Sequence, residues 1–292
     1  MIRPLLLHND RIRPAQERFF TPGQVGLLNG WGVFSTIKVT EGVLFAFPRH
    51  FARMKRDAQL MRVPFPFAME ELEERLLSLV EATQEYNSTL RVTVVRNKGT
   101  VFVGPDIDRD YELVAFVTER NNWGAGVSLG IVEQARHAAS RFAGAKITAW
   151  AMNLCLLEEA RERGFDEVVL LNERGEVSEC TSANIFAVMG GRVLTPPLDA
   201  GCLPGVTRAV LLEDIRNPRF HVAEQTLKPA DLEQADEVFI TSSTRDLLPV
   251  QSIEGLNLKA NDGPACRALQ ADFTAYEAAY VKNAARRAVV RA

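Results

Sequence analysis

The chain has 292 residues, of which 47% are hydrophobic and 24% are charged, a composition typical of a soluble globular protein. Its formal net charge of −3 at pH 7 argues against the strongly basic field that attracts nucleic acid or anionic membranes. The sequence shows no apolar run of the kind expected for a signal peptide or for the roughly 20 residues of a membrane span. The four cysteines show no metal-ligand spacing, and their sparseness indicates a reducing, cytoplasmic location and no metal site.

The first part of the chain alternates between strand-like and helix-like patterns. Residues 32–47 are typical of two strands around a turn at Glu41 and Gly42. The apolar spacing further predicts two amphipathic helices and then two strands, over residues 48–61, 69–83, 89–97 and 111–119. These elements predict a small α+β domain over residues 1–119.

Residues 120–126, RNNWGAG, are polar and rich in Gly and Asn, which is typical of a linker. We therefore expect a second, larger domain over residues 127–292. Its predicted strands, hairpins and helices follow in the order 127–135, 152–164, 166–179, 184–197, 203–215, 237–250 and 265–288. Hairpins outnumber βαβ crossovers, so the predicted fold class is α+β, with mixed, mainly antiparallel sheets and helices.

Two loops carry hydroxyl groups in settings that suit a phosphate. In LPGVTR, residues 203–208, a Pro-Gly turn leads into a helix whose free N–H groups and dipole favour an anion, and Thr207 adds a hydroxyl. TSSTR, residues 241–245, places four hydroxyl residues at the end of an apolar strand. Each loop also has a plain explanation, because Thr207 is a good helix N-cap and solvated Ser/Thr loops are common.

Three charged side chains are candidates for a buried site. Arg53 lies beside the apolar stripe of its predicted helix, although a surface pair with Asp57 would also explain it. Lys146, in RFAGAKITAW, and Glu179, in GEVSECTSANIF, lie among small and apolar residues. A buried carboxylate needs a cationic partner or a protonated ring nitrogen, and an apolar setting makes a lysine amine nucleophilic. Lys146 and Glu179 could therefore form a structural ion pair, or they could bind the two ends of one cofactor.

In this order the motifs resemble those of the class IV aminotransferases, the fold-type IV pyridoxal-phosphate enzymes. This family includes branched-chain aminotransferases, D-amino-acid aminotransferases and aminodeoxychorismate lyases. The similarity runs over residues 27–250 and is most specific over residues 164–208, where E-x4-N-I-F, T-P-P-L and L-P-G-V-T-R follow one another. The resemblance implies a homodimer with a small N-terminal α/β domain, a larger C-terminal domain and an active site between them.

The resemblance also implies roles for single residues toward pyridoxal 5'-phosphate. Lys146 matches the Schiff-base lysine, which also moves the proton at the substrate Cα. Glu179, 33 positions later, matches the carboxylate that keeps the ring nitrogen protonated, so that the ring can act as an electron sink. Leu203 matches the residue that packs on the ring.

The phosphate site is implied by three further matches. Arg53, in His50-x-x-Arg53, matches the phosphate-binding arginine. Val206 and Thr207 match the backbone and hydroxyl groups that hold the phosphate, and the second phosphate loop is matched by Ser242 and Ser243.

The substrate is less defined, because the motifs that separate the subfamilies are incomplete. Position 151 is Ala where branched-chain enzymes usually have Tyr, and position 149 is Ala where the lyases commonly have Asn. Ser35 and Thr36 resemble the F-T-T motif of the lyases. No Arg-x-His pair of the D-amino-acid enzymes is evident. The candidates for the substrate side, which could equally be core or surface residues, are Trp31, Phe34, Lys38 and Arg96.

Three functional hypotheses follow from these observations. The first is an aminotransferase acting on an amino acid, including branched-chain ones, and a 2-oxo acid. The second is an aminodeoxychorismate lyase that eliminates pyruvate in the folate pathway. The third is a non-catalytic relative, or an unrelated binding domain with a structural Lys146–Glu179 pair.

Overall fold

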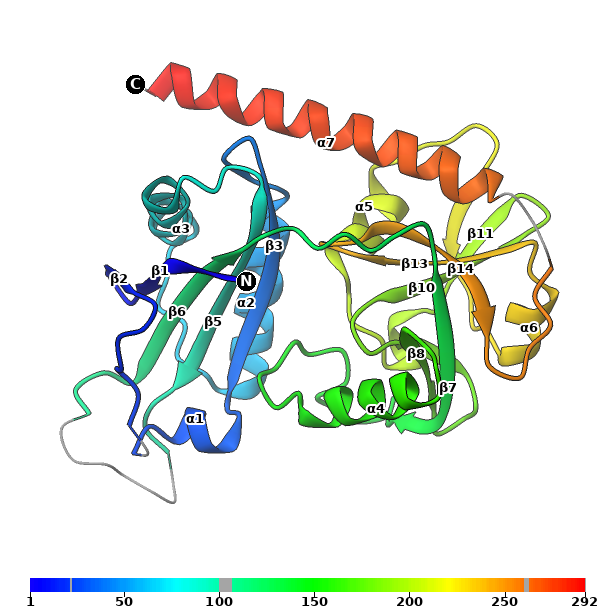
Figure 1. Ribbon diagram of the computed structural model, residues 1–292, viewed down its shortest axis with the longest axis horizontal. Helices are drawn as coiled ribbons and strands as arrows, with labels where there is room; N and C mark the ends of the chain where they lie inside the picture. The colour runs from blue at the N-terminus through cyan, green and yellow to red at the C-terminus, as the bar shows by residue number, and fades with distance from the viewer. Residues whose placement is uncertain (22, 100–106, 260–262, 292) are drawn as a thin grey trace. The chain divides into compact units, whose positions relative to one another are not determined.

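The computed structural model describes residues 1–21, 23–99, 107–259 and 263–291 (Figure 1). The chain divides into two compact units. The first unit comprises Met1–Arg120, Ala145–Trp150 and Ala279–Ala292, and the second comprises Asn121–Gly144 and Ala151–Ala278. None of the described helices is long and apolar enough to cross a membrane.

The first unit is built on a six-stranded antiparallel sheet in the order β2-β1-β6-β5-β3-β4. Its strands are β1 (Ile2–His8), β2 (Arg11–Pro14), β3 (Gly32–Thr40), β4 (Val43–Leu44), β5 (Ser88–Arg96) and β6 (Tyr111–Thr118). Its helices are α1 (Val25–Asn29), α2 (Phe47–Met61) and α3 (Met69–Thr83).

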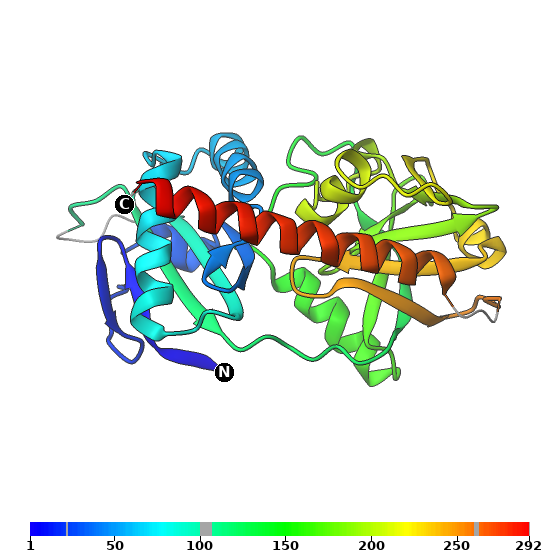
Figure 2. The same cartoon turned by 90° about the horizontal axis from the view of Figure 1, so that it is seen from above.

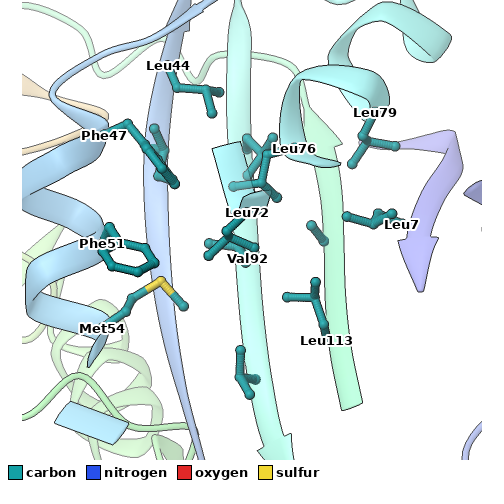
Figure 3. Packing of buried hydrophobic residues seen from close by; sticks show 14 of the residues in the cluster. Leu7, Leu44, Phe47, Phe51, Met54, Leu72, Leu76, Leu79, Val92 and Leu113 are labelled. Carbon is teal, nitrogen blue, oxygen red and sulfur yellow. The ribbon is translucent and has the colours of Figure 1, made fainter. Parts of the chain in front are cut away.

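Helices α2 and α3 cover the sheet of the first unit because each carries one apolar face. Apolar residues recur three or four positions apart on both helices, which places them on one side. The buried side chains that meet between helices and sheet include Phe47, Phe51 and Met54 of α2, Leu72, Leu76 and Leu79 of α3, and Val92 and Leu113 of the strands (Figure 3). Since α2 packs on β3, the polar residues on its buried side also lie near this strand.

The second unit contains an eight-stranded mixed sheet in the order β12-β11-β10-β13-β14-β7-β8-β9. The strands are β7 (Val127–Arg136), β8 (Glu167–Asn172), β9 (Val177–Cys180), β10 (Asn184–Met189), β11 (Arg192–Thr195), β12 (His221–Glu224), β13 (Glu237–Ser242) and β14 (Asp246–Ile253). The pairs β11–β12, β14–β7 and β7–β8 are parallel, and the other four pairs are antiparallel.

The helices of the second unit are α4 (Ala151–Glu162), the 3-10 helix η1 (Leu198–Ala200), α5 (Val206–Glu213), α6 (Pro229–Gln234) and the first part of α7 (Pro264–Arg291). Helix α7 runs unbroken to Arg291 (Figure 2). Its residues from Ala279 onward are grouped with the first unit.

The predicted fold class, α+β with mixed, mainly antiparallel sheets and helices, is confirmed by this topology. The predicted linker over residues 120–126 lies at the first boundary between the units. Residues 145–150, which we expected in the second domain, group with the first unit instead. The reason is that Ile147 forms a β-bridge with Val33 of β3. The compact units are therefore less continuous in sequence than the predicted domains.

Candidate active site

Lys146 is held through its main chain in the first unit. Its N–H donates to Oδ2 of Asp57 on α2 at 3.1 Å, and its C=O accepts from the N–H of Phe34 at 3.1 Å. Thr148 donates its N–H to the C=O of Gly32 at 2.9 Å. The segment thus pairs with the first residues of β3 and fixes the Cα of Lys146 beside this strand.

The side chain of Lys146 lies against an aromatic ring that it shares with an arginine. Its Nζ is 4.6 Å from the centroid of the Phe34 ring, and the guanidinium carbon of Arg91 is 3.8 Å from the same centroid. Burial lowers the pKa of Arg91, although an arginine remains protonated at neutral pH. Two cations against one buried ring favour an anionic ligand.

Arg91 was not predicted, because in the segment TLRVTVVR it occupies one of the alternating positions that usually face solvent. The register explains its place beside Phe34. Arg91 lies opposite Thr36 on β3, and Thr36 is two residues from Phe34 on the same face. The pairing of these two strands is the signal that identifies Arg91, because it brings Arg91 beside Phe34.

On the other face of β3, Ser35 contacts two residues of α2. Its Oγ accepts from Nη2 of Arg53 at 2.9 Å and lies 2.8 Å from Nδ1 of His50. Because a guanidinium only donates, the hydroxyl proton of Ser35 is available for Nδ1, and the ring proton of His50 then belongs on Nε2. All three side chains are buried.

The charges in this cluster suit an anion. Burial lowers the pKa of Arg53 to about 10, which leaves it charged at neutral pH. Burial, together with Arg53 and Lys146, lowers the pKa of His50 well below its usual value. Nε2 of His50 is buried and has no hydrogen-bond partner among the described residues. A buried donor beside a cation suits a phosphate oxygen. The phosphate-binding role of Arg53 stays a prediction.

Glu179 lies on β9 in the second unit and is nearly fully buried. Its Oε1 accepts from Nε of Arg136 at 3.2 Å, and its Oε2 accepts from the N–H of Leu203 at 3.0 Å. The C=O of Leu203 accepts from Nδ2 of Asn184 at 2.8 Å. The predicted ring-nitrogen carboxylate is thus fixed by an arginine and by the residue predicted to pack on the ring.

Helix α5 begins with an uncapped first turn. Its N-cap is Gly205, without a side-chain cap, so Thr207 is not the N-cap and lies in the first turn. A Cβ at Gly205 would come within 2.0 Å of Oδ1 of Asn184, so only glycine fits there. The N–H groups of Val206 and Thr207 have no acceptor within the helix, because the first N–H groups of an α-helix make no intrahelical hydrogen bond. This geometry fits a phosphate at the helix start.

The hydroxyl-rich loop connects β13 to β14. Ser242 ends β13 and pairs with Asp246, so that Ser243 lies in the tight turn between them. Thr241 pairs with Asn184 of β10, and Asn184 contacts both Leu203 and Gly205. Within the second unit, Asn184 therefore links the hydroxyl-rich loop to the start of α5 at one end of the sheet. Through Leu203 it is also linked to Glu179.

The other substrate-side candidates have different surroundings. Nε1 of Trp31 donates to the C=O of Met61 at 2.7 Å, and the Arg96 guanidinium lies 4.5 Å from the Trp31 ring. Arg96 donates to the main-chain oxygens of Lys98 and Arg62, so it supports the local backbone. Lys38 is half-buried on β3. Of the predicted set, Phe34 is the residue that the structure places at Lys146.

Residues 32–253 match the family model described as amino-transferase class IV. The chain belongs to this family. Class IV aminotransferases are enzymes that depend on pyridoxal phosphate. The chain is 29% identical over 233 residues to a putative branched-chain-amino-acid aminotransferase of Methanocaldococcus jannaschii, covering 79% of this chain and 81% of the relative.

The chain is also similar to a lyase of the family and to a solved branched-chain aminotransferase structure. The chain is 26% identical to an aminodeoxychorismate lyase of Bacillus subtilis, over 90% of this chain and 91% of the relative. The structure of a branched-chain amino acid aminotransferase from T.th., complexed with N-(5'-phosphopyridoxyl)-L-glutamate, matches with a TM-score of 0.82 at 26% identity and covers 92% of both chains. The fold-type IV architecture of this class IV aminotransferase is thereby confirmed.

Proposed function

We propose that this class IV aminotransferase carries pyridoxal phosphate on Lys146 and moves an amino group between an amino acid and a 2-oxo acid. Each unit carries residues that suit one part of the cofactor. In the first unit, Lys146 supplies an amine, and Arg53 supplies a buried cation for the phosphate. The second unit supplies Glu179 for the ring nitrogen, Leu203 beside it, and phosphate donors from Val206, Thr207, Ser242 and Ser243.

The chemistry of transfer divides between the cofactor and this chain. When bound, pyridoxal phosphate supplies an electron sink for the pair of electrons left on the substrate Cα. The Lys146 amine would take the proton from the substrate Cα and would deliver it to the cofactor carbon that receives the amino group. Glu179, fixed by Arg136 and the Leu203 N–H, holds a proton on the ring nitrogen. The Phe34 ring shields the amine from water on one side.

The observation that carries the proposal is the position of Arg91. A substrate carboxylate needs a cation near the lysine that acts on its Cα, and Arg91 and Lys146 lie against the same Phe34 ring. The aromatic rings of Phe34 and Trp150, which are 6.4 Å apart in an edge-to-face arrangement, add apolar surface on this side. This setting favours amino acids with apolar side chains, and the branched-chain relatives make these the first substrates to test.

A lyase activity is the second candidate, because Ser35 and Thr36 match the lyase motif and the lyase of Bacillus subtilis is similar over 90% of this chain. One assay separates the two functions. Pure enzyme is incubated with L-leucine, L-glutamate or D-alanine without an oxo acid, and its absorbance is followed. Stoichiometric conversion of the cofactor to its amine form supports the aminotransferase. Catalytic release of pyruvate from aminodeoxychorismate, without conversion by any amino acid, would contradict it and support the lyase.

We also propose that the enzyme acts as a homodimer. Helix α4 buries only Asn153 and Ala160 among its described side chains, while Met152 and Leu154 are 71% and 47% exposed. Large exposed apolar side chains on one helix are typical of an interface.

Light scattering tests this prediction. The wild type is expected at twice the chain mass, and a Met152→Glu, Leu154→Glu variant is expected at the chain mass. The matched control, Glu159→Gln on the same helix, should remain dimeric. A monomeric wild type at micromolar concentration would contradict the proposal.

A further inference from the structure

A buried ion pair lies behind the second phosphate loop of the second unit. Nη2 of Arg245 donates to Oε2 of Glu167 at 3.2 Å, and the two side chains are 7% and 0% exposed. Glu167 begins β8, and Arg245 is in the turn between β13 and β14. Neither residue belongs to the cofactor contacts proposed above.

Glu167 fixes the chain that follows Glu179. Thr181 Oγ1 donates to Oε1 of Glu167, and Ser182 Oγ donates to Oε2 at 2.5 Å. Thr181 comes two residues after Glu179, directly beyond the end of β9. The same carboxylate therefore anchors the exit of the strand that carries the ring-nitrogen residue.

Arg245 fixes the loop that contains Ser242 and Ser243. Its own N–H donates to Oγ of Ser242 at 3.2 Å, and its Nη1 donates to Oγ of Ser182 at 2.9 Å. Its guanidinium carbon lies 3.9 Å from the centroid of the Trp123 ring, and Nε1 of Trp123 donates to the C=O of Thr244 at 2.9 Å. One planar side chain thus connects both segments and is held flat by an aromatic ring.

The energetics favour a positioning role over a purely stabilising one. A buried ion pair gains little over well-packed apolar residues of similar volume, because both charges lose their hydration. The pair does provide geometric specificity, because the planar guanidinium can donate to its acceptors in only a few arrangements. The two segments that it joins are those proposed for the ring nitrogen and the phosphate.

We propose that Glu167 and Arg245 form a positioning pair, which holds the Ser242–Ser243 loop at a fixed distance from Glu179. At this distance one cofactor can bind the loop through its phosphate and Glu179 through its ring nitrogen. The inference rests on the proposed function, because it takes these residues as cofactor contacts. Disruption of the pair should weaken binding of the cofactor phosphate more than binding of the cofactor ring.

The experiment compares two forms of the cofactor. The full chain, freed of cofactor, is titrated with pyridoxal phosphate and with pyridoxal, which lacks the phosphate, and binding at the lysine is followed by absorbance. Arg245→Met should weaken binding of pyridoxal phosphate about tenfold to a hundredfold. This is the loss expected if the displaced Ser242–Ser243 loop no longer donates one charge-assisted hydrogen bond to the phosphate. The affinity for pyridoxal should remain unchanged.

Two further variants separate positioning from folding. Glu167→Gln combined with Arg245→Met removes both buried charges, so its melting temperature should recover relative to Arg245→Met, while phosphate selectivity stays low. The control is Arg163→Met, which removes the exposed pair of Arg163 with Glu254, 2.6 Å apart in the same unit. This control should keep the wild-type ratio of the two affinities.

The outcomes are distinct. A selective loss of affinity for pyridoxal phosphate in both Arg245 variants supports the pair. An unchanged affinity ratio, or a parallel loss for both compounds that follows the melting temperature, overturns it while the proposed function stands. If the wild type binds neither compound at Lys146, the proposed function fails and the inference falls with it.

Discussion

Arg91 and Arg96 both lie on β5 but have different contacts. Arg91 lies against the Phe34 ring beside Lys146, whereas Arg96 is bound to main-chain oxygens. We expect Arg91→Gln to raise KM for both the amino acid and the 2-oxo acid about tenfold to a hundredfold, because a charged hydrogen bond to the carboxylate is lost. Steady-state kinetics check this result.

The matched control is Arg96→Gln, which should leave KM near the wild-type value and lower only the melting temperature. If the two substitutions were to change KM equally, the assignment of the carboxylate to Arg91 would be wrong. A partial rescue by Arg91→Lys would agree with the loss of a planar fork and retention of the charge.

At the scale of residues, the sequence singled out as candidates those that stand in recognisable motifs. Lys146, Glu179 and Arg53 stand in segments of distinctive spacing, and the structure gives each a defined set of contacts. Arg91 was missed because its place beside Phe34 depends on the pairing of β3 with β5. Arg136, which lies 43 residues from Glu179 in sequence, was missed because only tertiary folding brings it to the carboxylate.

At the scale of elements, the start of α5 depends on one glycine. A side chain at Gly205 would collide with Asn184, whose amide is already bonded to Leu203. Gly205→Ala should therefore displace the first turn of α5, destabilise the fold by about 1–3 kcal/mol and weaken binding of pyridoxal phosphate. Thermal unfolding and a cofactor titration check both effects.

Ala209→Gly in the same helix is the control for helix stability. It should destabilise the fold by about 1 kcal/mol through backbone entropy and leave cofactor affinity unchanged, because it lies beyond the first turn. Equal cofactor affinity in Gly205→Ala and wild type would contradict a phosphate site at this helix start.

The elements that the sequence predicted are those with a long, regular period. Helix α3 matches its predicted bounds because Leu72, Leu76 and Leu79 repeat at helical spacing above the sheet. The hairpin of β1 and β2 was not predicted, since it contains two prolines and its edge strand β2 has no buried residue. The short strand β12 pairs in parallel with β11, a partner far away in sequence, and its own four residues carry no periodic signal.

At the scale of the whole molecule, acid stability should depend on Glu112. Burial acts to raise the pKa of this carboxyl, but hydrogen bonds from His8, Asn9 and Asn97 outweigh it and lower the pKa below the usual 4.5. A carboxyl with a lowered pKa stabilises the folded state above its unfolded pKa, and this stabilisation is lost as the pH falls through the folded pKa. We therefore expect the free energy of unfolding to decrease on acidification below about pH 5.

Urea unfolding at several pH values measures this dependence. Glu112→Gln should be less stable than the wild type at pH 7, and the difference should shrink as the pH falls below 4.5. Glu119→Gln, at an exposed ion pair with Arg3, is the control and should leave the pH profile unchanged. A constant difference between Glu112→Gln and wild type from pH 7 to pH 3 would contradict the role of ionisation.

The proposed function depends on covalent attachment of the cofactor at Lys146, and one measurement tests this attachment directly. The holoenzyme is reduced with borohydride, digested and analysed by mass spectrometry. We predict a phosphopyridoxyl group on the peptide that contains Lys146, and no such group in Lys146→Ala, which should still bind the cofactor noncovalently but not turn over. Labelling of a different lysine, or normal turnover by Lys146→Ala, would contradict the account.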